Sequence, residues 1–125
     1  MKLLLDTHVV LWMLLDDPKL KPAVRHRLAA PDAQLYVSVV TPWEVAIKAS
    51  LGRLEIDDDM QEPLTAFGVT FLGVELAHIA RLRKLPLHHK DPFDRMLFAQ
   101  ALAEGMTLVS ADRKAAAYEV PLLWA

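Results

Sequence analysis

Short apolar runs alternate along the chain with segments in which apolar residues recur every three or four positions. The first pattern is typical of strands buried on both faces, and the second of helices with one buried face. Because strands that alternate with helices form βαβ units, we expect an α/β fold in which helices cover both faces of a parallel sheet of four to five short strands. The expected strands are 2–5, 35–40, 69–74, 107–110 and 121–124, and the expected helices are 9–15, 18–30, 41–51, 57–67, 75–85, 93–104 and 112–118.

Hydroxyl, acidic and proline residues mark the expected helix starts. We expect Thr7 to cap the first helix and Thr41, followed by Pro42, to begin the third. Glu44 lies three residues after Thr41, which is the spacing of a capping box. The Asp-Pro pair at 91–92 is expected to begin the sixth and best-patterned helix.

Composition narrows the class of protein. The chain has 125 residues, so we expect a single domain over 1–125. Its 14 Lys and Arg against 16 Asp and Glu give a net charge of −2, which argues against a nucleic-acid binder that works by charge alone. The absence of cysteine excludes disulfides, cysteine-ligated zinc and thiol catalysis, and it fits a reducing compartment.

The N-terminal segment is only partly similar to a signal peptide. Lys2 is followed by three leucines, but Asp6 and His8 interrupt the apolar stretch. The longest apolar run, residues 9–15, is far shorter than the ~20 residues of a membrane span. We therefore expect a soluble, cytoplasmic protein with no membrane partner.

The positions of the acidic residues suggest a site. Asp6 follows the first expected strand, Asp112 follows the fourth, and Glu44 lies near the start of the helix after the second. Asp91 and Asp94 lie at the cap and in the first turn of the sixth helix. Because the carboxyl ends of parallel strands share one edge, we expect these carboxylates to meet there. A hard divalent cation would relieve their repulsion and bind phosphate oxygens, so the pattern favours metal-dependent phosphate chemistry.

Each acid taken singly also has a structural explanation. A carboxylate at a helix start caps the helix or interacts favourably with the helix dipole, which applies to Asp91, Asp94 and Asp112. Glu44 has the capping-box explanation given above. The joint placement at one expected edge is what favours a site.

Four segments form an ordered set of motifs: LLLDTH at 3–8, SVVTPWEV at 38–45, HKDPFDRMLFAQA at 89–101 and LVSAD at 108–112. Together they resemble the PIN-domain family, and more narrowly the VapC-type toxins of bacterial and archaeal toxin–antitoxin operons. The resemblance extends over essentially the whole chain. It implies a three-layer α/β/α fold around a twisted parallel sheet, and endoribonuclease activity that depends on Mg²⁺ or Mn²⁺, with one or two ions per site.

The resemblance also implies a role for each acid. The catalytic quartet is Asp6, Glu44, Asp94 and Asp112. Asp6 and Asp94 are the most direct metal ligands, while Glu44 and Asp112 complete the site directly or through water. Ser110 matches a small hydroxyl residue of the family and is expected to bond to the site or to the substrate. The implied reaction is hydrolysis of an RNA phosphodiester by a metal-activated water, which leaves a 5′-phosphate and a 3′-hydroxyl.

Residues beside the quartet have more than one interpretation. Asp91, one turn before Asp94, is an outer partner of the site or only the helix cap. Arg95 is expected to support the metal in stabilising negative charge at the phosphorus. The adjacent His88 and His89 do not face one centre, so we expect a loop role for both.

A basic segment precedes the acidic helix. Arg81, Arg83, Lys84 and Lys90 are expected to contact RNA phosphates on either side of the cut. The same residues have a simpler explanation, because basic side chains favour helix C-termini and are normally solvated.

The family further implies a homodimer and a small cognate antitoxin protein whose tail crosses the site. The wholly apolar stretch 9–15 offers more apolar surface than one helix face needs, which favours such an interface. Within the family, the alternative is an RNA-processing nuclease that is not a toxin. From another class, a Mg²⁺-binding phosphoacceptor regulatory domain also places acids at strand ends, but it requires an acidic pair after the first strand and a lysine after the last, which this chain lacks.

Overall fold

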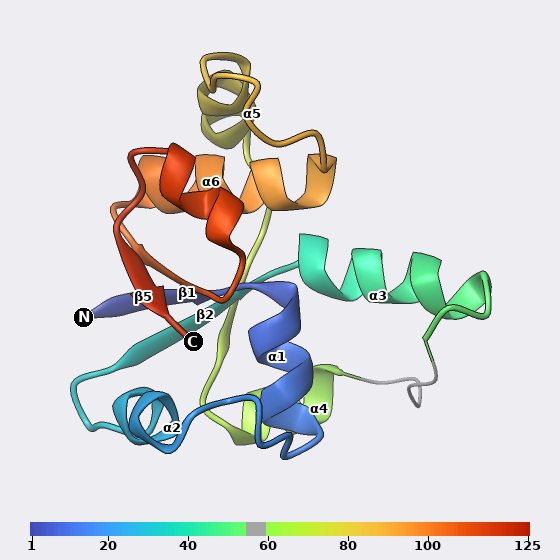
Figure 1. The fold of residues 1–125 in the computed structure, drawn as a ribbon, viewed down its shortest axis with the longest axis vertical. Coiled ribbons are helices and arrows are strands. Elements are labelled where there is room, and N and C mark those ends of the chain that lie inside the picture. Colours follow the sequence, from blue (N-terminus) through green and yellow to red (C-terminus); the bar gives the residue numbers. More distant parts are fainter. Residues whose placement is uncertain (55–59) are drawn as a thin grey trace.

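The computed structural model describes residues 1–54 and 60–125 (Figure 1). The five strands of these residues form one sheet in the order β3-β2-β1-β4-β5, and each neighbouring pair is parallel. The expected α/β fold with a parallel sheet is therefore confirmed. In chain order the elements are β1 (Lys2–Leu5), α1 (Thr7–Leu14), α2 (Pro22–Leu28), β2 (Gln34–Ser38), α3 (Val40–Ser50), α4 (Gln61–Ala66), β3 (Thr70–Leu72), α5 (Leu76–Arg83), α6 (Pro92–Glu104), β4 (Thr107–Ser110), the 3₁₀ helix η1 (Arg113–Ala117) and β5 (Leu122–Trp124).

Alternate residues of the central strand β1 serve two hydrophobic cores. Leu3 and Leu5 pack with apolar residues of α1, α2, α3 and α4, whereas Leu4 packs with those of α6 and η1. All three leucines are fully buried. Figure 1 shows the same division, with α6 and η1 on one side of the sheet and α1, α2 and α4 on the other. The molecule therefore has three layers, helix on sheet on helix.

The strand order creates a switch point at β1. The chain adds β2 and β3 on one side of β1 and then returns to add β4 and β5 on the other. The carboxyl ends of β1 and β4 thus lie side by side where the direction of winding reverses, which is the usual ligand position in open α/β sheets. Contacts of Thr7 with Glu44 and of Trp43 with Phe93 bring α1, α3 and α6 together near their starts.

Two expected helix starts are wrong by one or two residues. The N-cap of α1 is Asp6, not Thr7, and Thr7 is the first helical residue. The helix α3 begins at Val40, not Thr41, because β2 ends at Ser38, whose Oγ accepts a hydrogen bond from the Val40 backbone N at 3.1 Å. In both cases an earlier side chain, Asp6 or Ser38, accepts a hydrogen bond from a backbone N at the start of the helix.

Other boundaries differ more. The helix α2 begins at Pro22 and not at residue 18, because Asp17 accepts hydrogen bonds from the backbone N atoms of Lys19 and Leu20 and forms a turn there. The first part of the expected helix 57–67 lies outside the described residues, and α4 covers Gln61–Ala66. The expected helix 112–118 is a short 3₁₀ helix.

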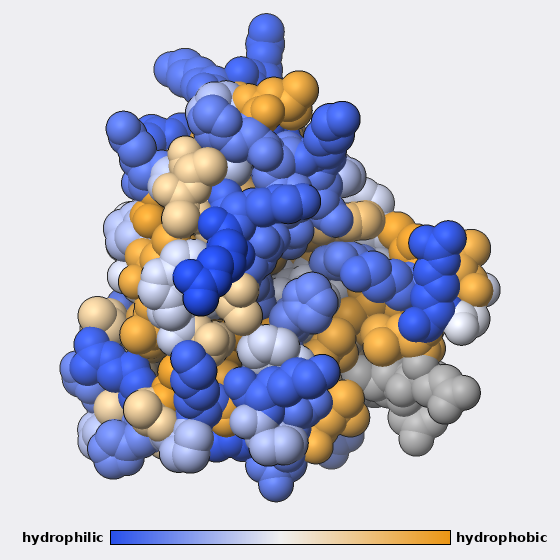
Figure 2. Space-filling model, in the orientation of Figure 1, coloured by the Kyte–Doolittle hydropathy of each residue, from blue (hydrophilic) through white to orange (hydrophobic). Residues whose placement is uncertain are grey.

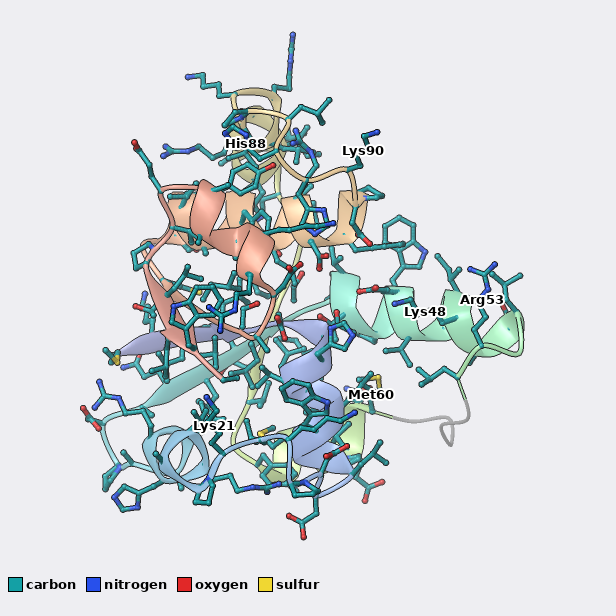
Figure 3. The ribbon with its side chains drawn as sticks, viewed as in Figure 1. Lys21, Lys48, Arg53, Met60, His88 and Lys90 are labelled. Carbon is teal, nitrogen blue, oxygen red and sulfur yellow. The ribbon has the colours of Figure 1, made fainter. Side chains whose placement is uncertain are left out.

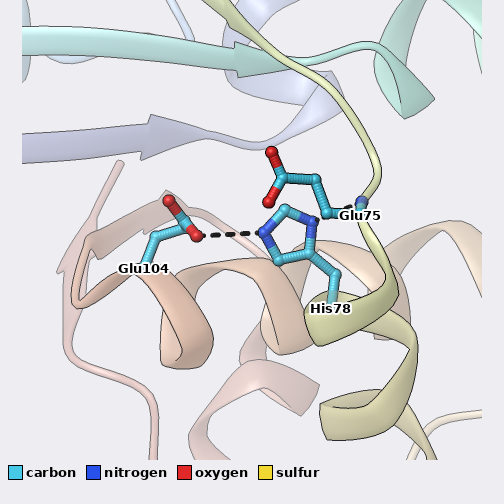
Figure 4. A group of neighbouring side chains, drawn as sticks. All are labelled: Glu75, His78 and Glu104. Atoms are coloured by element: carbon cyan, nitrogen blue, oxygen red, sulfur yellow. Dashed lines mark hydrogen bonds and ion pairs between the residues drawn. The ribbon is translucent and has the colours of Figure 1, made fainter.

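A buried histidine links α5 to α6 (Figure 4). The Nδ1 atom of His78 accepts a hydrogen bond from the backbone N of Glu75 at 3.0 Å, and its Nε2 lies 3.1 Å from Oε2 of Glu104. Because Nδ1 is an acceptor, the ring proton is on Nε2, which donates to Glu104. The three residues therefore form a structural link, and Nε2 has no free electron pair for a metal in this tautomer.

Apolar side chains are also exposed. In α1, Val9, Val10 and Met13 are buried, but Leu15 just beyond the helix is 60% exposed. Figure 2 shows further hydrophobic residues around the outer part of α3, where Leu51 is exposed. Among the described residues, no helix is both long and apolar enough to cross a membrane.

Candidate active site

Asp6 and Asp112 follow the adjacent strands β1 and β4. Asp6 is almost fully buried and caps α1 by accepting a hydrogen bond from the backbone N of Val9 at 2.9 Å. The Ser110 hydroxyl bonds to the Asp6 carboxylate and accepts a hydrogen bond from the backbone N of Asp112 at 3.0 Å. Burial raises the pKa of Asp6, and the bonds from Ser110 and Val9 offset only part of this effect. Ser110 therefore lies between the two acids, as part of the site.

Glu44 reaches the site from α3. Its Oε1 accepts a hydrogen bond from the Thr7 hydroxyl at 2.7 Å, and its Oε2 lies 2.8 Å from the Lys48 ammonium one turn later. The expected capping box is wrong, because Thr41 is inside the helix and its hydroxyl lies 3.3 Å from that of Thr7. Both oxygens of the buried Glu44 carboxylate are thus held, one by α1 and one by a cation.

Lys48 shows that the acids of α3 and α6 are neighbours. Its pKa is raised chiefly by the hydrogen bond to Glu44, and also by the charges of Asp91 and Asp94 on the other helix. Figure 3 shows Lys48 on α3 and Lys90 just before α6. The same ammonium group therefore screens carboxylates from two elements.

Asp94 lies in the first turn of α6, and its pKa is strongly raised. Burial raises its pKa to about 7, with further contributions from the carboxylates of Asp91, Glu44 and Asp112, while His89 acts in the opposite direction. The carboxylate at 94 therefore lies in the field of acids from α3, from the α6 cap and from the end of β4. These electrostatic contributions are consistent with the convergence that the sequence predicts, and the catalytic quartet stays a prediction.

His89 is the residue that the sequence interpretation missed. It is buried, and its Nε2 lies 3.0 Å from Oδ2 of Asp94 and 3.0 Å from Oδ2 of Asp112. Its Nδ1 accepts a hydrogen bond from the backbone N of Asp91 at 3.2 Å, so the proton is on Nε2 and is shared between the two carboxylates. The expected loop role is therefore too narrow for His89. A loop role does fit His88, whose ring packs edge-on against that of Tyr118, with the ring centroids 5.4 Å apart.

Asp91 is the N-cap of α6. Its Oδ1 accepts hydrogen bonds from the backbone N atoms of Phe93 and Asp94, at 2.8 and 3.1 Å. It also lies close enough to Asp94 to raise the pKa of that carboxyl. The capping role is thus observed, and Asp91 lies beside the acidic site.

The basic residues take different positions. The Arg95 guanidinium donates to the carbonyl oxygen of Pro86 at 3.0 Å and to the Tyr118 hydroxyl at 3.3 Å, so it holds the loop that carries His89. The expected role of Arg95 in stabilising negative charge at the phosphorus stays a prediction. Arg81 and Lys84 line a surface cavity of about 530 Å³. Arg83 and Lys90 are likewise exposed, Lys90 directly before the α6 cap.

The donors at this edge fit a hard divalent cation. They are carboxylate oxygens, the ligands that Mg²⁺ and Mn²⁺ prefer, and burial together with the neighbouring carboxylates raises the pKa of Asp94. Ligand atoms of His89, Asp94 and Asp112 lie within 4.8 Å of one another. Because the His89 Nε2 carries a proton in this arrangement, the carboxylates are the better ligands.

Sequence signals for the additional residues were weak. Thr7 and Lys48 each have an ordinary local explanation, as a helix start and as the i,i+4 partner of Glu44. A histidine two residues before a helix cap has no spacing rule that assigns it to a site. Only the fold brings Thr7 and Lys48 to Glu44, and His89 to Asp94 and Asp112.

Known proteins resemble the chain over nearly its full length. The family model described as PIN domain matches residues 3–121. The ribonuclease VapC22 of Mycobacterium tuberculosis is 27% identical over 121 residues, which are 94% of this chain and 92% of that protein. A chain from the structure of VapBC2 from Rickettsia felis, bound to a DNA fragment from their promoter, superposes with a TM-score of 0.74 at 15% identity, covering 99% of this chain and 98% of that one. A chain of DNA-bound VapBC from Salmonella typhimurium gives 0.73 at the same identity and coverages. At such identities the superpositions show a shared fold.

Proposed function

The chain belongs to the PIN-domain family, and from this premise we propose that it is a metal-dependent endoribonuclease that acts as the toxin of a toxin–antitoxin pair. Similarity to the ribonuclease VapC22 supports the activity. Similarity to chains of VapBC complexes supports an antitoxin partner. The observation that supports the proposal is that Asp6 and Asp112 follow the adjacent strands β1 and β4, while burial and the carboxylates of Asp91, Glu44 and Asp112 raise the pKa of Asp94 to about 7.

We infer that the cofactor is Mg²⁺ or Mn²⁺, held by Asp6 and Asp94 with Asp112 beside them. When bound, such a cation supplies Lewis-acid stabilisation of a phosphate and lowers the pKa of a nearby water. Glu44 is assigned a contact through water, because both of its oxygens already accept hydrogen bonds from Thr7 and Lys48. Whether one or two ions bind is a question for titration.

Neutralisation of the acids is needed before RNA can approach. A phosphodiester carries a negative charge, and four carboxylates at one edge repel it. The protein already supplies two partial screens, the Lys48 ammonium on Glu44 and the His89 Nε2–H between Asp94 and Asp112. These groups hold the acids in place, and the cation completes the screening.

Other residues of the chain position the acids. Ser110 fixes Asp6 relative to Asp112, and Thr7 fixes Glu44 relative to α1. Arg95 holds the loop that presents His89, and its support of the metal in stabilising charge at the phosphorus remains part of the proposal. The proposed contacts of RNA phosphates are Arg81, Arg83, Lys84 and Lys90, all of which are exposed.

The proposed partners are an RNA substrate, a small antitoxin protein and a second copy of the chain. The exposed apolar side chains at Leu15 and Leu51 support protein interfaces. RNA cleavage together with a chain free of cysteine supports action in the cytoplasm.

The test is cleavage of total RNA by the purified protein, with Mg²⁺, with Mn²⁺ and with a chelator. We expect cleavage only with a divalent cation, and products with 5′-phosphate and 3′-hydroxyl ends. Asp6→Asn is expected to lower the rate by at least about 100-fold, because the amide loses the charge that holds the cation. Asparagine is also a good N-cap, so α1 and the fold should be retained, as checked by circular dichroism.

Asp32→Asn is the matched control, because Asp32 lies on an exposed turn away from the sheet edge, and its rate should equal that of the parent. Products with 2′,3′-cyclic phosphate would contradict hydrolysis by water. Growth arrest on expression, relieved by a small protein encoded beside this chain, would separate a toxin from an RNA-processing nuclease.

A further inference from the structure

An exposed aromatic pair stands beside the acidic site. Trp43 on α3 precedes Glu44, and Phe93 on α6 precedes Asp94. The two rings meet edge to face, with centroids 5.0 Å apart and planes at 81°. Although Glu44 is buried, 60% of Trp43 is exposed. The pair therefore bridges the two helices that carry the acids, on their solvent side.

The geometry leaves a flat apolar surface open. An edge-to-face contact uses the edge of one ring and the face of the other, and it fixes the orientation of both. Phe93 is half-buried and thus supports Trp43, which remains largely in water. Exposure of so large an aromatic surface is unfavourable, so a fixed and exposed tryptophan beside a site indicates a ligand that stacks on it.

The charges around the pair favour a nucleotide as that ligand. Lys90 lies just before α6, and Lys48 lies on α3 one turn after Glu44, to which it is ion-paired. Both side chains are exposed enough to meet a phosphate. Aromatic rings that receive bases, next to cations that receive phosphates, are the usual means of binding single-stranded nucleic acid. A helix of a protein partner would instead need a broad apolar groove, whereas Lys48 and Lys90, from the same two elements, are charged.

We propose that Trp43, supported by Phe93, stacks on an unpaired base of the RNA beside the scissile phosphate. This inference rests on the proposed ribonuclease function and adds a contact with a base to it. In an A-form duplex the bases are stacked on one another and are not available to a tryptophan. Trp43 therefore binds the base next to the cut only when that base is unpaired and turned out of its stack.

The first experiment compares cleavage of total RNA, with Mn²⁺, by the parent and by variants of the pair. Trp43→Ala is expected to raise KM by about 5- to 100-fold, the range for loss of one stacked base, with kcat changed less than about threefold. Trp43→Phe should recover most of the KM, because a phenyl ring also stacks. Phe67→Ala, which removes an exposed aromatic residue at the end of α4, is the matched control and should keep the parental KM.

The second experiment uses Trp43 as its own probe, in a Trp12→Phe/Trp124→Phe background where it is the only tryptophan. A single-stranded oligoadenylate of twelve nucleotides should quench its fluorescence, whereas an abasic oligomer of equal charge and the adenylate–uridylate duplex should not. This readout needs no Trp43→Ala protein, so a folding defect in that variant leaves the test intact.

The outcomes separate the two levels of inference. If the parent cleaves no RNA, both the proposed function and the proposed stacking of a base on Trp43 are wrong. If the parent cleaves RNA but Trp43→Ala keeps the parental KM, or the abasic oligomer quenches equally, only stacking is overturned. If Trp43→Ala keeps the parental KM but the antitoxin no longer relieves its growth arrest, the aromatic pair binds the antitoxin and not RNA.

Discussion

At the scale of single residues, the choice between helix cap and site residue turns out to be a false alternative. Asp6 caps α1, Asp91 caps α6 and Asp112 caps η1, and all three lie at the acidic edge. For Asp6 and Asp112 the reason is that each helix begins where a strand ends, so the carboxylate that caps the helix also faces the crevice. Asp91 caps α6, which follows α5, and it reaches the edge because the start of α6 lies beside α3. The sequence could place these acids at the edge, but it could not show that one side chain serves both purposes.

The pKa of Asp94 makes a prediction about stability in the presence of a chelator. Between its ordinary value of 3.8 and about 7, folded Asp94 keeps a proton that the unfolded chain has lost. The free energy of unfolding therefore falls as the pH rises through this window. Asp94→Asn removes the ionising group and with it this loss of unfolding free energy. The variant should therefore become more stable than the parent as the pH rises from 4 to 8, by up to about 4 kcal/mol.

Urea denaturation in EDTA across this pH range measures the effect. The difference between parent and Asp94→Asn should widen steadily as the pH rises, while Asp32→Asn follows the parent. A constant difference from pH 4 to pH 8 would show that Asp94 ionises as an ordinary carboxyl, and the electrostatic basis of the metal site would then be lost.

His89 shows why part of the site could not be read from the sequence. Its contribution depends on the backbone N of Asp91 meeting Nδ1, which directs the Nε2 proton toward Asp94 and Asp112. Its neighbour His88 has the same residue type and faces Tyr118 instead. A difference of one position thus separates a site residue from a loop residue, and only the loop conformation decides it.

At the scale of elements, the start of α6 fixes Asp94. Asp91→Ala removes a side chain that accepts two backbone hydrogen bonds there, and it should cost about 1 kcal/mol of folding free energy. Asp91→Asn keeps the cap and should keep the parental stability. Urea denaturation of both variants at pH 7 measures the difference.

The same pair of variants decides whether Asp91 also binds the cation. If Asp91 is only the cap, Asp91→Asn should cleave RNA at the parental rate, and Asp91→Ala should lose activity only as far as Asp94 is displaced. A large loss in Asp91→Asn at full stability would instead identify Asp91 as a ligand.

Element positions were more predictable than element ends. Strand 2–5, strand 107–110 and the helix that Asp91 begins follow from apolar runs and strong cap residues. The starts of α2 and α3 could not be predicted in this way. Each segment offers two or three adjacent residues that can accept hydrogen bonds from the first backbone N–H groups of the helix. Tertiary contacts make the choice, as when Thr41 is drawn into the helix beside Thr7.

At the scale of the whole molecule, alternation of strands and helices predicts the parallel sheet but not its strand order. The order places β1 between β2 and β4, and so brings Asp6 beside Asp112, which is more than one hundred residues later in the chain. The sequence supports a common edge for all strand ends. The placement of β4 next to β1 depends on how the second half of the chain packs on the first.

A cation bound at this edge would join both halves of the chain, so it should stabilise the molecule as a whole. A ligand present at 100 times its dissociation constant adds about 2.7 kcal/mol, which corresponds to a rise in Tm of about 10 °C for a domain of this size. We expect Mn²⁺ to raise Tm in a dose-dependent manner in the parent and in Asp32→Asn. The rise should be absent or much smaller in Asp6→Asn and Asp94→Asn, which draw their ligands from opposite halves of the chain. If removal of only one of these carboxylates abolished the shift, the ion would belong to one half alone, and the joint site would have to be abandoned.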